Sequence, residues 1–534
     1  MNFLGCFAKF KRKAFHESRV YVKLFYGGPI YTFEKEGEQL EAVLVSNGHI
    51  VRTGTFEQLQ PHAKSFQHLN GHTMIPGLVD SHIHLIGYGQ QITTISLEEA
   101  KSSAEILKRL KEASVHLKND EWLIAQGWNE FNLEDGMPTI QQLDEIAQPV
   151  LLHRVCRHVA MVNTKAIELV DFQSTKGGKV GTTSTGQRNG YFYDEAIVPF
   201  NEKVLVQGEA LKVQLIKHVE AAIAQLQRYG LVGVHTEDCA YYGSYENVVH
   251  AFKQTVGQNA HFRLHLLRHH NVFNQMMHAE ITPIEGFIEF GAMKIFVDGS
   301  FGGSTAALLA DYTNEKGNTG LLVHSEQQFE KLVQQARHYN EAIAVHMIGD
   351  RAAELVLAMI EKYPTPVGKR DRLIHACLLN EKLMDRMNAL PSIIVDIQPA
   401  FVPSDFPWVK NKLGVERLRY AYAWKALKNC HIALGTDAPI EDVRPLHTIY
   451  AAVMRNTYSE FPTDEALTLF EAFQAYTMGS AYAISKEYER GLIKEGYVAD
   501  FTIFEKDPFH IDLEYLREID VSETIVNGKT VYKK

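Results

Sequence analysis

Along the middle of the chain, segments with the apolar period of a helix alternate with short, continuously apolar segments. Over residues 211–226 apolar side chains recur every three or four positions, which predicts an amphipathic helix, and Gly230 then precedes a short apolar strand. The same order of helix and strand recurs, since a predicted helix over residues 329–336 precedes the strand AIAVHMIGD. A further helix is predicted over residues 352–360. Repeated apolar strands joined by helices are typical of a parallel sheet covered on both faces. We therefore expect an α/β fold that closes into an eight-stranded barrel.

Both ends of the chain show the shorter period of β-strands. EAVLVSNGHIVRTG sets Asn47-Gly48 between apolar alternations, and SETIVNGKTVYKK does the same around Asn527-Gly528. Asn-Gly supplies the positive φ angles of a two-residue hairpin turn, so each pair predicts a β-hairpin. We expect the two ends to meet in one small β domain.

The predicted organisation has a discontinuous domain, a barrel and an insertion. Residues 1–20 are interpreted as an extension, residues 21–75 and 487–534 as the β domain, and residues 76–486 as the barrel. Residues from about 97 to 201 do not fit one helix–strand repeat and are interpreted as an insertion, with the aromatic residues Trp122, Trp128 and Phe131 followed by a glycine-rich stretch. The insertion is either a lid over the site, with Trp128 as a candidate for substrate contact, or a packing excursion without substrate contact.

Composition and charge restrict the class of partner. The chain has 534 residues, 45% of them hydrophobic and 22% charged, with a formal net charge of -10. This balance argues against nucleic acid or an acidic membrane surface as the main partner and favours a small-molecule substrate. The five cysteines stand singly, which is typical of reduced thiols in a cytoplasmic protein. No apolar run approaches the roughly 18 residues of a membrane span.

The segment GLVDSHIHL, from Gly77, contains the first candidate ligands. Side chains alternate along a strand, so His82 and His84 project to the same face about 7 Å apart and can share one metal ion. Asp80 falls on that face too, and we hypothesise that it fixes the tautomer of a ligating histidine. Many His-x-His runs are incidental, so this pair needs support from elsewhere in the chain.

Four more polar residues end predicted apolar strands. They are Lys294 in AMKIFVDGS, His346 in AIAVHMIGD, His375 in RLIHACLL and Asp437 in IALGTDAPI. A single histidine on an apolar strand is more often a hydrogen-bonded core residue, and Asp437 would also suit the N-cap of a following helix. In an α/β barrel, however, the carboxyl ends of the strands converge on one mouth, so scattered positions form a cluster. Nitrogen and carboxylate ligands together suit zinc or a similar divalent ion.

From about Tyr26 to its end the chain resembles the metal-dependent amidohydrolase superfamily. The motifs are GLVDSHIHL, MKIFVDGS, AVHMIGDRA, LIHACLL and GTDAP, followed by LTLFEAFQAYTMGSAYA and GLIKEGYVADFTIFEKDP. The last two look most like the branch that includes N-substituted formamide deformylases. The resemblance implies a (β/α)8 TIM barrel with one or two divalent metal ions and a flanking β-sandwich made from both chain ends. Homo-oligomerisation is a further expectation from the superfamily.

The resemblance also implies roles for individual residues. His82, His84 and Asp437 match the ligands of the more buried metal, and His346 and His375 those of the second. Lys294 matches the position at which binuclear members carry a carboxylated lysine that bridges both ions. A free ammonium has no lone pair, whereas a lysine carbamate offers two anionic oxygens.

The mechanism that the resemblance implies is hydrolysis of a non-peptide C–N bond, in an amide or an N-substituted formamide. Zinc lowers the pKa of a bound water to about 7 and so provides hydroxide at neutral pH. The resemblance implies that Asp437 takes the proton from this water and delivers it to the leaving nitrogen, while the metal stabilises the oxyanion.

Two departures from the branch pattern bear on the substrate. Where the branch commonly has Asp-Gly-His, this chain has Cys156-Arg157-His158, and His158 matches a residue that helps to hold the substrate carbonyl. Where relatives often read GSLGSRTA, this chain reads GSFGGSTA, with Ser304 in place of arginine. We hypothesise that Arg157 replaces the missing positive charge; a surface arginine without a role is the alternative.

Two other functions stay open at this stage. A deaminase of a small heterocycle would use the same superfamily fold, with a carboxylate directed at a planar ring. A non-catalytic module that keeps the fold would have lost metal ligands, whereas here the whole set is present. A metalloprotease has no support, because the sequence contains no H-E-x-x-H helix.

Overall fold

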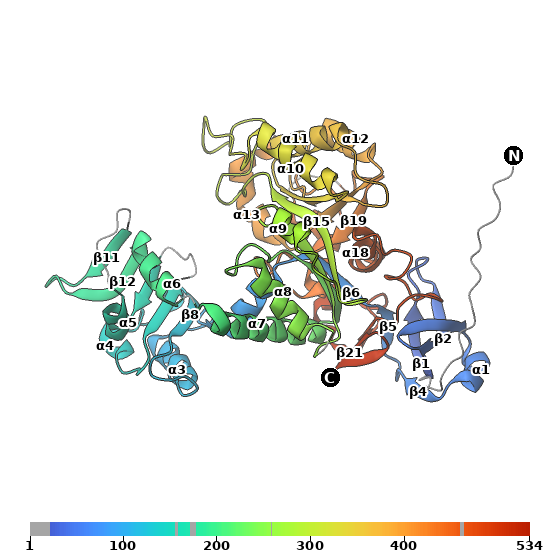
Figure 1. Ribbon diagram of the computed structural model, residues 1–534, viewed down its shortest axis with the longest axis horizontal. Helices are drawn as coiled ribbons and strands as arrows, with labels where there is room; N and C mark the ends of the chain where they lie inside the picture. The colour runs from blue at the N-terminus through green and yellow to red at the C-terminus, as the bar shows by residue number, and fades with distance from the viewer. Residues whose placement is uncertain (1–21, 155–158, 171–177, 205, 258, 460–463) are drawn as a thin grey trace.

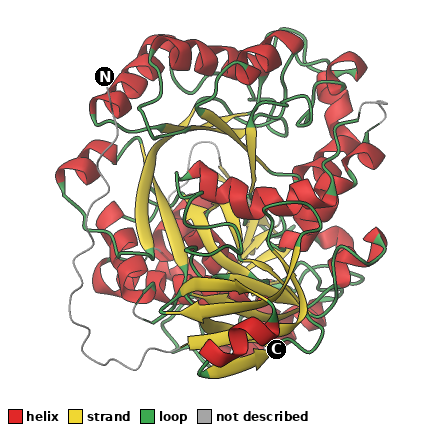
Figure 2. Ribbon diagram, turned by 90° about the vertical axis from the view of Figure 1, so that its right-hand side faces the viewer, coloured by secondary structure: helices red, strands yellow, loops and turns green. Residues whose placement is uncertain are grey.

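The computed structural model describes residues 22–154, 159–170, 178–204, 206–257, 259–459 and 464–534. Its central sheet has eight parallel strands in the order β19-β18-β17-β16-β15-β14-β13-β6. This is the order of strands along the chain, as the barrel prediction requires, and Figure 2 shows the strands inside a ring of helices. The strands are β6 (Leu78–Ile83), β13 (Leu231–Thr236), β14 (Arg263–His269), β15 (Ile288–Phe296), β16 (Ile343–Met347), β17 (Asp371–His375), β18 (Ile393–Ile397) and β19 (His431–Leu434).

The predicted helices between these strands are confirmed. The helix expected over residues 211–226 is α7 (Gly208–Arg228), and its buried face carries the apolar side chains that predicted it. Within the described residues, no helix combines the length and the apolar character that a membrane crossing needs. The other helices around the barrel are α2 (Leu85–Thr93), α8 (Tyr245–Thr255), α9 (Phe273–His278), α10 (Glu326–His338), α11 (Asp350–Lys362), α12 (Glu381–Asn388), α13 (Phe401–Leu413), α14 (Val415–Leu418), α15 (Pro445–Val453), α16 (Arg455–Tyr458), α17 (Leu469–Gln474) and α18 (Ser480–Ala483).

Both chain ends contribute to one flanking sheet, with the path β22-β21-β20-β5-β1-β2-β3 and with β4 paired to β1. The predicted flanking β domain made from both chain ends is thus confirmed, and its strands follow one hydrogen-bonded path. The reason lies in β1, whose register shifts between Tyr26 and Ile30, so its first part pairs with β4 and its last part with β5. The strands are β1 (Val22–Tyr31), β2 (Gln39–Ser46), β3 (His49–Gly54), β4 (Ser65–His68), β5 (Thr73–Pro76), β20 (Phe501–Phe504), β21 (Val521–Val526) and β22 (Lys529–Lys533), with the helix α1 (Phe56–Leu59) beside them.

The two hairpins predicted from Asn-Gly pairs are confirmed and lie against each other. Asn47 and Gly48 have φ angles of 50° and 77°, and Asn527 and Gly528 have 55° and 73°, which is the conformation of a type I′ turn. A Cβ on Gly48 would lie 2.0 Å from the side-chain oxygen of Asn527, so this close approach and the positive φ both favour glycine there. The two ends of the chain therefore meet in the β domain.

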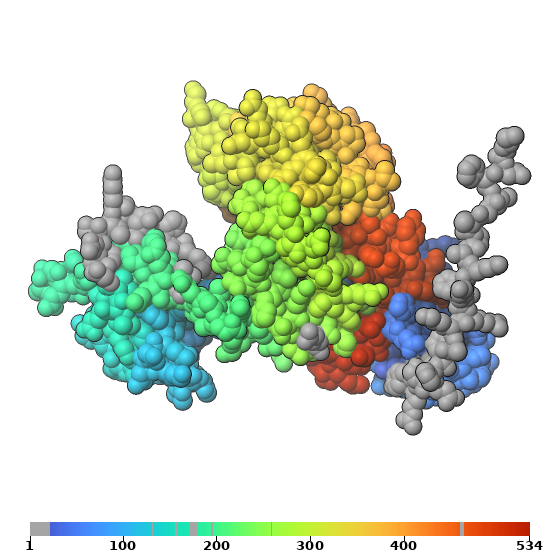
Figure 3. All heavy atoms as spheres, in the orientation of Figure 1, coloured from blue at the N-terminus to red at the C-terminus, as the bar shows by residue number. Residues whose placement is uncertain are grey.

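The insertion between α2 and α7 has its own sheet, in the order β11-β12-β10-β9-β8-β7, and its own buried apolar clusters. It projects from one end of the long axis of the molecule, and the flanking sheet lies at the other end (Figures 1 and 3). Its elements are β7 (Ile95–Ser96), α3 (Ser103–Ser114), β8 (Leu123–Trp128), α4 (Ile140–Leu143), β9 (Val150–Arg154), β10 (Val159–Val162), α5 (Thr164–Leu169), β11 (Gly178–Thr182), β12 (Arg188–Asp194) and α6 (Val198–Val204). The extension predicted for residues 1–20 lies outside the described residues.

A buried ion pair joins the flanking sheet to the barrel. Arg263, the first residue of β14, donates from Nε and Nη2 to the two carboxylate oxygens of Asp500 over 2.7 and 2.9 Å. The side chains are 6% and 8% exposed, so neither charge is solvated if its partner is removed. Asp500 also accepts from the backbone N–H of Asn527, at the turn of the C-terminal hairpin.

This pair predicts a large loss of stability on truncation of one partner. Asp500→Ala should lower the free energy of unfolding by about 3–5 kcal/mol, because the Arg263 charge stays buried without its counter-charge. Urea denaturation followed by circular dichroism measures the change. The exposed pair of Lys486 and Glu489 is the control, and Lys486→Ala should cost at most about 1 kcal/mol. Equal losses in the two variants would contradict a special role for the buried pair.

Candidate metal centre

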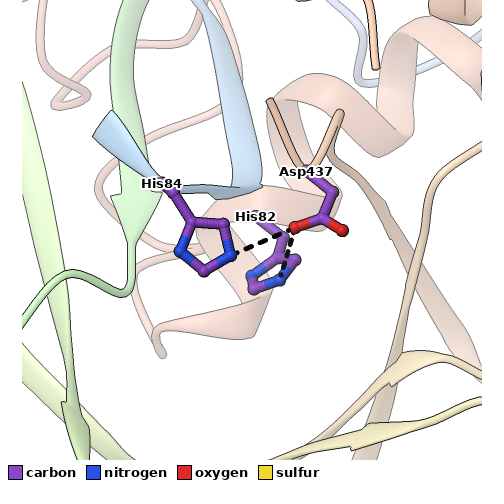
Figure 4. Close-up of side chains that lie close together, drawn as sticks. All are labelled: His82, His84 and Asp437. Atoms are coloured by element: carbon purple, nitrogen blue, oxygen red, sulfur yellow. Dashed lines mark ion pairs between the residues drawn. The ribbon is translucent and has the colours of Figure 1, made fainter. Parts of the chain in front are cut away.

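Three side chains meet where the first and last barrel strands end. His82 is the last but one residue of β6, His84 directly follows this strand, and Asp437 follows β19. Both imidazole Nε2 atoms lie 3.3 Å from Oδ1 of Asp437, and Figure 4 shows the two rings directed at that oxygen. One ligand atom from each residue lies within 4.8 Å of the others. Two imidazole nitrogens and a carboxylate oxygen at this spacing fit a divalent ion such as zinc.

Hydrogen bonding outside the group fixes the orientation of His84. Its Nδ1 lies 2.7 Å from the backbone carbonyl of Glu237, which can only accept, so Nδ1 carries the proton and Nε2 is left for the centre. Burial by itself would lower the pKa of His84, but hydrogen bonding and charge attraction from Asp437 raise it to about 9. The position therefore attracts a cation, whether a proton or a metal ion.

His82 is held in the state that a ligand needs. It is 1% exposed, and burial, with the nearby charge of Lys294, lowers its pKa to about 3. The ring is therefore neutral and keeps a lone pair at neutral pH. Its Nε2 lies 3.4 Å from Nζ of Lys294 as well as 3.3 Å from Asp437.

The other predicted ligands lie beside these three. Lys294 on β15 is fully buried, and this burial lowers its pKa. The ring centre of His375, at the end of β17, lies 5.7 Å from that of His82 and 4.6 Å from that of His346 on β16. The structure thus brings all six predicted residues to one mouth, although within the described chain the tight group of ligand atoms consists of His82, His84 and Asp437.

Two of these residues have a strained backbone. Asp437 has a φ of 59° and His375 a φ of 75°, in the left-handed region that residues other than glycine rarely adopt. Such strain costs on the order of 1–3 kcal/mol and clusters at functional sites. The N-cap alternative for Asp437 is excluded, because the next helix, α15, begins at Pro445 and its N-cap is Arg444.

Asp80 has partners other than the expected imidazole. Its Oδ1 accepts from the backbone N–H of His82 at 3.0 Å and of Thr436 at 3.2 Å, and its Oδ2 accepts from the Thr436 hydroxyl at 2.6 Å. The prediction that the Asp80 carboxylate contacts a histidine ring is therefore replaced by these contacts with the backbone and with Thr436. The strand period placed Asp80 on the inner face, but its carboxylate turns to the backbone of β6 and of the segment after β19, and so positions His82 and Asp437 together.

The remaining candidates lie elsewhere. Trp128 is 2% exposed in the core of the insertion, where its Nε1 donates to the Leu152 carbonyl, so the structure does not bring it to the metal centre. Ser304 donates to Glu315 and accepts from Nζ of Lys412 at 2.6 Å, which places a positive charge beside the position of the missing arginine. Arg157 and His158 lie outside the described residues.

Two residues that follow β13, Glu237 and Tyr241, were not predicted from the sequence. Glu237 is fully buried and accepts from the hydroxyl of Tyr241 at 2.8 Å, while its carbonyl orients His84. The ring centre of Tyr241 lies 6.3 Å from that of His84. The signal was the acidic pair Glu237-Asp238 directly after a predicted apolar strand, which is the placement that identified the other ligands.

Comparison with known proteins gives a consistent result. The model of the amidohydrolase family matches residues 67–532. YtcJ of Bacillus subtilis (strain 168), an amidohydrolase by name, is 40% identical over 96% of this chain and 99% of its own length. An N-substituted formamide deformylase of Arthrobacter pascens is 24% identical over 95% of this chain and 97% of its own. The crystal structure of an uncharacterized metal-dependent hydrolase from Pyrococcus furiosus has a TM-score of 0.77 and 25% identity, covering 91% of this chain and 99% of that one.

The contacts of Asp80 predict how metal retention depends on it. Asp80→Asn would turn an amide donor toward groups that themselves donate, so the backbone at His82 and Thr436 should shift. We expect metal affinity to fall about 10–100-fold, measured by elemental analysis after dialysis against graded chelator. Asp464→Asn, at an exposed carboxylate paired with Lys425, is the control. If Asp80→Asn retains metal as the control does, this carboxylate is not required for the centre.

Proposed function

Because the chain belongs to the amidohydrolase family, we propose that it is a metal-dependent hydrolase that cleaves the C–N bond of a small amide or N-substituted formamide. The single observation that carries the proposal is the meeting of His82, His84 and Asp437 at the barrel mouth, with ligand atoms within 4.8 Å of one another. Similarity to a formamide deformylase over 95% of this chain supports the choice of bond.

We assign the ligands as follows. His82, His84 and Asp437 would hold one divalent ion, which we expect to be zinc, and His346 and His375 would hold a second. When bound, such an ion polarises a carbonyl and lowers the pKa of a coordinated water to about 7. Lys294 is proposed to bridge as a carbamate. Its burial lowers the amine pKa and so favours the neutral amine, the form that can react with carbon dioxide.

Asp437 is the proposed proton carrier. An amide nitrogen is a poor leaving group until it is protonated, so the reaction needs a group that accepts a proton from water and gives it to nitrogen. Oδ1 of Asp437 faces the two imidazoles, and the side chain is only 11% exposed, which keeps competing bulk water away from it. By resemblance, His158 would hold the substrate carbonyl.

A substrate screen tests the proposed reaction. The zinc-loaded protein should release formate or a carboxylic acid from a panel of N-formyl and N-acyl amines, and a chelator should abolish the release until zinc is restored. Formate and amine products are followed by chromatography. Ammonia released from a heterocycle instead would identify a deaminase. Protein that purifies without metal and hydrolyses nothing in the panel would contradict an enzymatic role.

A substitution tests the role of Asp437. Asp437→Asn should lower kcat about 10²–10⁴-fold, because the amide cannot carry the proton. The metal content of the same preparation is measured, so that loss of the ion is separated from loss of proton transfer. Asp442→Asn, five residues further on and outside the group, should keep normal turnover. Normal turnover in Asp437→Asn would remove Asp437 from the mechanism.

A further inference from the structure

A row of aromatic side chains borders the metal centre on one side. The ring centre of Tyr241 lies 6.3 Å from that of His84 and 5.7 Å from that of His269. The ring centre of Phe296 lies 5.9 Å from that of His269 and 5.2 Å from that of His346. These contacts lead from one proposed ligand of the first metal ion to one of the second, past the ends of β13, β14 and β15. A substrate held at the centre would therefore lie beside this aromatic wall of Tyr241, His269 and Phe296.

Tyr241 is the most exposed member of the aromatic wall. It is 49% exposed, whereas His269 is 5% exposed and Phe296 is partly buried. It lies on the segment after β13, and β13 is the neighbour of β6, the strand that leads into His84. Tyr241 is therefore the member of the wall that offers most surface to a substrate.

The hydroxyl proton of Tyr241 is already used inside the protein. Its Oη donates to Oε2 of Glu237 at 2.8 Å, and Glu237 is fully buried. Oε1 of the same carboxylate has no hydrogen-bond partner among the described residues. A buried carboxylate is costly to leave without a donor, so the proton of Tyr241 stays directed at Glu237.

The hydrogen-bonding capacity that Tyr241 keeps is that of an acceptor. A phenol hydroxyl has one proton and free lone pairs, and it is protonated at neutral pH. With the proton directed at Glu237, Oη can only accept a hydrogen bond from a ligand. It therefore matches a ligand group with an N–H or an O–H, and it offers nothing to a nitrogen that carries no hydrogen.

The number of substituents on the nitrogen decides whether a C–N substrate has such a donor. An amide with one substituent on nitrogen carries an N–H beside its carbonyl, whereas an amide with two substituents carries none. An N–H held by Tyr241 and a carbonyl held at the centre would fix both ends of the bond that is cleaved. Holding the reacting groups in this way is a general source of rate enhancement.

We propose that Tyr241 accepts a hydrogen bond from the substrate nitrogen and thereby selects amides and formamides that keep one N–H. The inference rests on the proposed function, since it concerns the C–N bond that we place at the metal centre. Tyr241 is then a specificity-determining residue, and Glu237 is the positioning residue that holds its hydroxyl in the accepting orientation.

Hydrolysis of N-propylformamide and of N-methyl-N-propylformamide by the zinc-loaded, full-length protein tests the proposal. Both compounds release formate, so one assay gives kcat/KM for each. We expect the protein to prefer N-propylformamide, and Tyr241→Phe should reduce this preference about tenfold, which is the effect of losing one hydrogen bond. Loss of metal or partial unfolding would lower both rates together and leave their ratio unchanged, so the ratio reports the contact with the N–H.

Tyr363→Phe is the matched control. Tyr363 also donates its hydroxyl to a glutamate, Glu330, at 2.6 Å. It lies between α11 and the start of β17, at the end of the barrel opposite the metal centre. Its preference between the two formamides should equal that of the unaltered protein. If Tyr241→Phe fails to fold, Tyr241→Leu removes the acceptor at the same half-exposed position and should cause the same loss of preference.

Two results would overturn the inference and leave the proposed function intact. One is an unchanged preference in Tyr241→Phe, and the other is equal hydrolysis of the two formamides by the unaltered protein. A third result is distinguishable from both. If neither formamide releases formate and no N-acyl amine releases its acid, the proposed function is contradicted and the inference falls with it.

Discussion

Closure of the barrel depends on a set of hydrogen bonds at the seam between β6 and the segment after β19. The N–H of Asp437 donates to the His82 carbonyl at 2.7 Å, and the N–H of His84 donates to the Ala438 carbonyl at 2.9 Å. The buried carboxylate of Asp80 joins the same two segments through His82 and Thr436. The residues that close the sheet are thus the candidate metal ligands, so barrel closure and assembly of the site are one event.

The closeness of this seam limits which residues it accepts. A Cβ on Gly435 would lie 2.5 Å from the backbone nitrogen of His82, so the two segments approach only because glycine stands there. Directly afterwards the chain takes a positive φ at Asp437, which turns the carboxylate toward the imidazoles. The energy of this strained turn is offset by the bonds on both sides of it, and the geometry of the centre is fixed before any ligand arrives.

The sequence predicted what depends on local pattern. Helix α7 and the Asn-Gly hairpins follow from periodicity and turn chemistry, which neighbouring residues determine. The convergence of Lys294, His346 and His375 followed from their position at strand ends, because any parallel barrel brings such ends together. The hydrogen-bonding partners of individual side chains were harder to predict. The strand period gave the face of Asp80 but not its turn toward backbone groups. The acidic pair after β13 marks the position of Glu237, but not the carbonyl through which this residue orients His84.

The flanking sheet is assembled from segments that are synthesised far apart in time. β5 ends at Pro76, and its partner β20 begins at Phe501, with the whole barrel encoded between them. While the ribosome makes that intervening chain, one edge of β5 has no native strand to pair with. An open edge of this kind invites pairing with other chains. The nascent protein is therefore open to aggregation until its last strands emerge. A chaperone that shields the early strands during translation would act at this stage.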